Sequence, residues 1–196
     1  NALGLYSLLS TVPGLFSWLL PQGLINGLQV FSGWLAVVSG PLAIYAMNRI
    51  YRIKARPFWD HWQVLTTFYG SMLTLGTLAV GVVYAVALAA QGRAFSALLS
   101  VLVWPMALGL VIEAVGLAMH AHDLEKRGGE AAASHLEQRT TFGNTYILRN
   151  IGLAISIAAL VVLGLAPLDG IAGAMAWIGV AALLIATAAV GRALFY

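Results

Sequence analysis

Hydrophobic residues form long runs in this chain, and charged residues are confined to short clusters between the runs. Asp, Glu, Lys and Arg are absent from residues 1–48, 61–92, 94–112, 150–168 and 170–191. A helix that crosses a bilayer needs about 20 mostly apolar residues, and backbone in lipid must satisfy its own hydrogen bonds. The pattern therefore predicts an all-α, polytopic transmembrane bundle, with residues 1–196 forming a single transmembrane domain of about six spans. We place these spans at about 5–20, 27–51, 64–90, 95–119, 146–166 and 171–194.

Composition excludes several other classes of protein. The chain is 61% hydrophobic and 9% charged, with a mean hydropathy of +0.89, whereas soluble domains are about 25% charged. The runs lack the alternating polarity of outer-membrane strands. The basic residues sit at the ends of apolar runs and not on a soluble face, so we expect no nucleic-acid partner. The chain has no Cys, which excludes a disulfide or a cluster held by its own thiolates.

The few basic residues predict how the chain is oriented in the membrane. Nine of the ten fall on one side of an alternating six-span arrangement, and only Arg93 falls on the other. Cytoplasmic loops collect Lys and Arg. We therefore expect both termini on the cytoplasmic side of a bacterial inner membrane, with the lipid bilayer around the spans.

The longest polar segment, residues 120–145, is expected to be a loop, because it has mixed charge and contains Gly128-Gly129. The four histidines, His61, His120, His122 and His135, lie in or beside the two basic loops. A two-haem cytochrome normally needs His pairs near both membrane surfaces, so we expect no haem here. The i, i+2 spacing of His120 and His122 points their rings apart, so we expect no metal site and interpret all four as interfacial.

Glu113 is the one acidic residue inside a predicted span. An ionisable group at that depth is costly and is a functional candidate by default, so it is a candidate for a proton path or a wet cavity. Two structural roles are open beside it: the carboxylate pairs with Arg149, or it reaches the cytoplasmic boundary about two helical turns away.

The segment from Ala55 to Trp62 is the densest polar and aromatic cluster, and it contains Arg56, Trp59 and His61. Such a cluster is typical of an interfacial belt, where Trp sits at headgroup depth and Arg reaches toward water. The alternative is a mouth where a quinone head group stacks and accepts hydrogen bonds, with His61 also a candidate for passing protons.

Many glycines lie within the predicted spans, where small residues allow close helix contact. We expect that role for the glycines at positions 70, 76, 81, 109, 116, 152, 173 and 179.

Three segments resemble the anchor subunits of the dimethyl sulfoxide reductase family, which are related to polysulfide reductase membrane subunits. They are IYAMNRIYRIKARPFWDHWQVLTTF at residues 44–68, NTYILRNIG at 144–152 and GRALFY at 191–196. They occur in the family's order. Asn150 stands where the family pattern has Glu, which puts a charge role there in doubt.

The resemblance implies a haem-free, eight-span subunit that anchors a molybdopterin catalytic subunit and an iron–sulfur electron-transfer subunit. It exchanges electrons with quinone (menaquinone or ubiquinone), with no catalytic residue and no haem or iron–sulfur cluster of its own. It makes Tyr146 and Arg149 candidates for partner docking. Family members extend further at the N-terminus, and this chain starts at Asn1, so we expect it to be the later part of a longer chain, about two spans short.

Two other functions compete with a quinone-linked anchor. A secondary transporter is disfavoured because no inverted repeats or paired broken spans are visible. A purely structural membrane scaffold is the other alternative, since the family's quinone motifs lie in the N-terminal part that this chain lacks.

Overall fold

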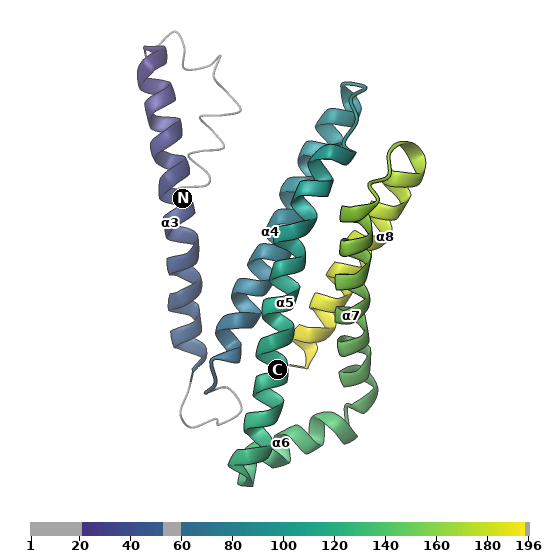
Figure 1. Ribbon diagram of the computed structural model, residues 1–196. Coiled ribbons are helices and arrows are strands. Elements are labelled where there is room, and N and C mark those ends of the chain that lie inside the picture. The colour runs from purple at the N-terminus through teal and green to yellow at the C-terminus, as the bar shows by residue number, and fades with distance from the viewer. Residues whose placement is uncertain (1–20, 53–59, 195–196) are drawn as a thin grey trace. The chain divides into compact units, whose positions relative to one another are not determined.

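The computed structural model describes residues 21–52 and 60–194, and within these ranges every regular element is a helix (Figure 1). The helices are α3 (Gln22–Tyr51), α4 (Gln63–Ala90), α5 (Ser96–Arg127), α6 (Gly129–Thr140), α7 (Gly143–Leu165) and α8 (Gly170–Ala193). The chain divides into two compact units, Asn1–Ile50 and Tyr51–Tyr196. Each unit is described by itself.

In the first unit, the described part is α3, a 30-residue helix with Pro41 inside it. It confirms the span expected at 27–51 and begins five residues earlier. The span expected at 5–20 lies outside the described residues. Within the described residues of the whole chain, five helices, α3, α4, α5, α7 and α8, are long and apolar enough to cross a membrane.

The second unit is built from two helical hairpins and one short connecting helix. Residues 91–95 join α4 to α5, and residues 166–169 join α7 to α8. Helix α5 contacts both α4 and α7, while α8 contacts α7 and α4. Helix α6 leads from the end of α5 to the start of α7 and contacts both (Figure 1). The buried core between the long helices consists of apolar residues at positions 78, 103, 106, 107, 110, 153, 160, 163, 180 and 184.

The outer surface of this unit is apolar, whereas small polar side chains are inside. Ile155 and Ile178 are 51% and 63% exposed, while Ser156 and Thr187 are 0% and 9% exposed. In water, large apolar side chains such as these would be buried in the core. Their exposure here fits a helix bundle surrounded by the lipid hydrocarbon of a bilayer. The expectation of an all-α transmembrane bundle is confirmed by the helices and their apolar surfaces.

Close contact between α4 and α5 depends on glycine. A Cβ atom at Gly70 would stand 2.6 Å from the carbonyl oxygen of Gly109, and one at Gly109 would stand 2.6 Å from that of Gly70. A Cβ atom at Gly116 would overlap the hydroxyl of Thr66. The close-contact expectation is wrong for Gly76 and Gly179, where a Cβ atom would meet no described atom within 4 Å.

The expectation of a loop over residues 120–145 is also wrong. Helix α5 continues to Arg127, because residues 120–127 are mostly good helix formers and they bury His120 and Leu124 against the bundle. Gly128 and Gly129 have positive φ angles of 66° and 56°, which glycine adopts readily. The chain therefore turns there and starts α6 at once.

Candidate functional site

A polar cavity lies at one end of the second unit, where α4 and α7 begin and α5 and α8 end, with α6 beside it. Its volume is about 30 Å³. A cavity needs about 10–15 Å³ to hold one water, so this space accommodates a water or two. Its lining comprises Gln63, Thr67, Glu113, Leu117, His120, Ala121, Leu124, His135, Gln138, Tyr146, Arg149, Gly191 and Leu194.

Glu113 faces this cavity, together with Arg149 of α7. A Cβ atom added to Gly191 of α8 would stand 3.8 Å from the Glu113 Oε1 atom and 3.9 Å from the Arg149 Cδ atom. The missing side chain at Gly191 therefore keeps open the space beside both residues. Within the described part of the chain, Glu113 and Arg149 form no direct ion pair, and both side chains line the same cavity.

Arg149 is held inside the unit and is only 7% exposed. Its guanidinium carbon lies 4.8 Å from the centre of the Tyr146 ring, within the range of a cation–π contact. Its Nε and Nη2 atoms donate to the Oδ1 atom of Asn150 at 3.1 and 2.9 Å. These contacts hold the positive charge of Arg149 at the cavity wall. Tyr146, about one helical turn earlier on α7, lines the same cavity.

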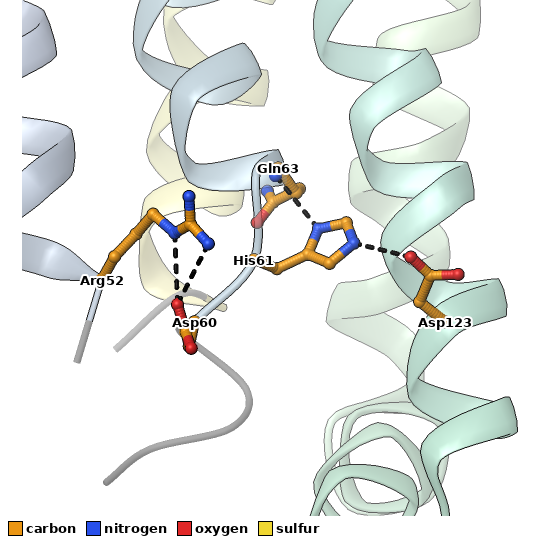
Figure 2. A network of polar contacts seen from close by, with 5 residues as sticks. All are labelled: Arg52, Asp60, His61, Gln63 and Asp123. Carbon is orange, nitrogen blue, oxygen red and sulfur yellow. Dashed lines mark hydrogen bonds and ion pairs between the residues drawn. The ribbon is translucent and has the colours of Figure 1, made fainter. Parts of the chain in front are cut away.

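His61 connects the start of α4 to α5 through two hydrogen bonds (Figure 2). Its Nδ1 atom accepts the backbone N–H of Gln63 at 3.0 Å, and its Nε2 atom lies 2.9 Å from Oδ2 of Asp123. An accepting Nδ1 has no proton, so the ring proton is on Nε2 and is donated to Asp123. His61 as a whole is 3% exposed. Both nitrogens are therefore already engaged, which makes His61 a connecting residue and not a free proton carrier in this conformation.

The neighbouring basic segment is only partly described. The Nε and Nη2 atoms of Arg52 each lie 3.2 Å from Oδ1 of Asp60, which ties residue 52 to the approach of α4 (Figure 2). Arg56 and Trp59, the candidates for a quinone mouth, lie outside the described residues.

Two further histidines are buried beside the cavity, although we expected interfacial positions. His120 is 5% exposed, and its ring centre lies 4.7 Å from that of His61. His135 of α6 is 4% exposed, and its Nδ1 atom lies 3.6 Å from Oε1 of Glu125 at the surface. Burial lowers the pKa of His135, Arg139 and Arg149 lower it further, and Glu125 opposes the shift.

The cavity brings together some of the predicted residues and adds others. Glu113, Tyr146 and Arg149 line it, whereas His61 stands behind His120 and does not. His120, His135 and Gly191 were missed as site residues. One signal was readable in α5: positions 113, 117, 120, 121 and 124 follow helical spacing along one face, and all of them line the cavity.

The cavity does not fit every ligand that the sequence suggests. An apolar cavity of about 150 Å³ is known to hold benzene, so about 30 Å³ is too small for a quinone ring. Among the described residues, no group of three or more His, Cys, Asp or Glu side chains is arranged to hold a metal. A second cavity of about 240 Å³ lies between α4, α5 and α8 and is lined by apolar residues including Phe95, Met106 and Trp177. It has room for hydrocarbon, and among its lining side chains only the indole N–H of Trp177 could donate a conventional hydrogen bond to a quinone oxygen.

Comparison with known proteins decides the family. The family model described as DMSO reductase anchor subunit (DmsC) matches residues 7–196. The chain belongs to this DMSO reductase anchor subunit family. No curated protein and no solved structure matches the chain. The family resemblance is thus confirmed, and the long apolar helices of this DmsC-family chain are those of a multi-pass membrane protein that associates with catalytic oxidoreductase subunits.

Proposed function

We propose that this chain anchors a molybdopterin oxidoreductase to the membrane and exchanges electrons between the quinone pool and an iron–sulfur partner subunit. The observation that carries the proposal is the family match over residues 7–196. The chain has no Cys, which supports a separate electron-transfer subunit, because iron–sulfur clusters held by Cys thiolates must then belong to that partner.

The proposal includes an orientation in a bacterial inner membrane. Lys126, Arg127 and Arg139 lie near the polar cavity in sequence and fold, and Arg192 is in the last turn of α8. Because basic loops favour the cytoplasm, the cavity end is the cytoplasmic end, as is the C-terminus. A reporter fused after Tyr196 that is active only in the periplasm would contradict this orientation.

The cavity supports a role in moving protons and not in holding the quinone ring. Glu113 is the acidic group inside it and has room for water at its side. Arg149 is buried in the cavity wall, so we assign it to the electrostatics of Glu113 and leave partner docking to exposed residues. Arg56 and Trp59 remain the candidates for contact with the quinone head group.

The test uses the complex purified with its partner subunits. Turnover is measured once with a quinol analogue and once with a reduced dye that donates directly to the partner subunits. Glu113→Gln keeps the shape of the side chain but removes its exchangeable acid. General acid–base groups contribute about 100-fold or more, so we expect quinol-dependent turnover to fall at least about tenfold and dye-dependent turnover to remain.

The matched control is Glu137→Gln, which removes an exposed carboxylate of α6 outside the cavity. We expect no change with either donor. A wild-type complex that turns over with the dye but never with quinol would contradict the proposed function. A Glu113→Gln complex with full quinol turnover would remove Glu113 from the proton path only.

A further inference from the structure

We infer that His135 carries protons between the cavity around Glu113, which has room for water, and the protein surface at Glu125. The inference rests on the proposed function, because quinol oxidation must release protons. It concerns a residue on a connecting helix that the sequence pattern assigned only to a polar loop.

The position of the imidazole supports this role. The Nδ1 atom of His135 is directed to the Glu125 carboxylate at 3.6 Å, and Glu125 has a side chain that is 57% exposed. The Nε2 atom is fully buried and has no hydrogen-bond partner among the described residues. A buried polar atom without a partner points to an ordered water, and the cavity that His135 lines has room for one.

The neighbouring His61 is less suited to the task. His61 uses both ring nitrogens in the contacts with Gln63 and Asp123. Adding a proton to its Nδ1 atom would break the bond from the Gln63 backbone. His135 has no such constraint, because its inner nitrogen is available to a cavity water and its outer nitrogen faces a surface carboxylate.

The proton transfer balances as follows. A cavity water accepts the proton of the Glu113 carboxyl group and gives one to Nε2 of His135, which forms an imidazolium. The proton on Nδ1 then passes to Glu125 or to bulk water, and the neutral ring returns in its other tautomer. A rotation of the ring about its Cβ–Cγ bond then turns the bare nitrogen back toward the cavity, and the quinol gives Glu113 a new proton, so that a second proton can follow. The two electrons of the quinol go to the iron–sulfur partner. Quinone reduction runs the same steps in reverse.

Other charged groups shape the route without blocking it. Arg149 faces Glu113 across the cavity, and Arg192 of α8 also acts on Glu113. Arg139 shares Glu125 with His135, with its Nη1 atom 3.3 Å from the Oε1 atom. The surface carboxylate therefore has a permanent cation beside it as well as the imidazole.

The first experiment removes the carrier and then replaces it. His135→Ala is introduced into the whole complex, and quinol-dependent turnover is measured with and without added imidazole. We expect a fall of about tenfold or more, recovery of at least about threefold with imidazole, and unchanged dye-dependent turnover. His122→Ala, which removes an exposed histidine of α5, is the matched control and should alter neither rate.

Different results would overturn different claims. Full quinol turnover in His135→Ala, or a loss that imidazole does not relieve, would overturn the carrier role while leaving the proposed function standing. A wild-type complex without quinol turnover would overturn the proposed function and the carrier role with it.

A second experiment tests for water in the cavity and needs no turnover. The natural chain has no Cys, so Gly191→Cys introduces a single thiol beside Glu113. Its Cβ atom would meet neighbours only at ordinary contact distance, 3.8 Å or more. Gly179→Cys on the same helix is the control, since it faces open space on the apolar surface. We expect a charged, water-soluble thiol reagent to label position 191 at least about tenfold faster, because the reactive thiolate forms in water. Equal rates at the two positions would show a dry cavity and overturn the inference.

Discussion

The crossing of α4 and α5 at Gly70 gives a sharp test of how this bundle is held together. Gly70→Ala adds one methyl group where the backbones of the two helices touch. Its carbon would stand 2.6 Å from the Gly109 carbonyl oxygen and 3.1 Å from the Glu113 Cβ atom. The first distance falls short of ordinary contact by about 0.8 Å. Because the obstructing atom belongs to the backbone, no rotamer change can relieve the overlap, and the helices must separate.

The size of the effect follows from that separation. A radial gap of about 0.5–1 Å forfeits roughly a quarter to a half of each van der Waals contact, and overpacked core sites typically lose about 1–3 kcal/mol. We therefore expect Gly70→Ala to lower the free energy of unfolding by about 2 kcal/mol, which is about a 30-fold change in the unfolding equilibrium.

The assay compares Gly70→Ala with Gly76→Ala in the same detergent micelles. Both variants are titrated with a denaturing detergent and followed by tryptophan fluorescence and helicity. Gly76 lies on the same helix with no described neighbour within 4 Å of an added Cβ atom. Any gain in helix propensity on replacing glycine is therefore shared, and only the overlap differs. Equal unfolding midpoints for the two variants would refute the reasoning.

Three further predictions concern contacts at other positions in the second unit. Asp169→Ala removes the carboxylate that accepts the backbone N–H and the hydroxyl of Ser96, 3.2 and 2.6 Å away. Thermal unfolding in micelles should show that the free energy of unfolding falls by about 1 kcal/mol, as when a helix cap is lost, and Asp169→Asn should lower it less. Gly152→Ala should cost less than about 1 kcal/mol in the denaturing-detergent titration used for Gly70→Ala, because the atom it meets at 2.7 Å is the side-chain hydroxyl of Thr187, which can rotate away. Burial lowers the pKa of His135 in the folded chain, so the unfolded chain takes up this proton first, and its contribution to stability should be lost as pH drops below about 6.5. His135→Gln should therefore weaken, without abolishing, the fall of the unfolding midpoint measured from pH 8 to pH 5, because the buried His120 remains.

The positions of the long helices could be predicted because charge is scarce and its absence is a strong signal. The four spans expected in the second unit coincide with α4, α5, α7 and α8 to within a few residues, except that α5 runs on to Arg127. That extension was missed because charged residues were taken as the end of the span. The edge of the hydrocarbon layer decides where apolar side chains are needed, but a helix does not have to end there. Helix α5 therefore continues past that edge and ends at Arg127, before Gly128.

The cavity was harder to predict, because its lining residues come from several helices. The spacing of residues along one helix does not show how far they lie from residues of another helix. Glu113 stood out as a carboxyl group within an apolar run. His135 did not, since its burial requires α6 to fold back onto α5 and α7. Gly191 carries no chemistry of its own and matters only because Glu113 and Arg149 are on either side of the space it leaves.

The same close crossing that stabilises the bundle also fixes the acid in its cavity. The position that a Cβ atom at Gly70 would take is 3.1 Å from the Glu113 Cβ atom, whereas one at Gly191 would come no closer than 3.8 Å to the Glu113 carboxylate. Gly70→Ala must therefore displace α5 and Glu113 together, so it should lower stability and quinol turnover at once. Gly191→Ala adds a methyl group to the cavity without parting the helices, so it should slow proton exchange while leaving the unfolding midpoint unchanged. If quinol turnover depended on packing alone, Gly191→Ala would turn over as the wild type does. A loss of turnover in Gly191→Ala at an unchanged unfolding midpoint would therefore separate the role of the cavity from the stability of the fold around it.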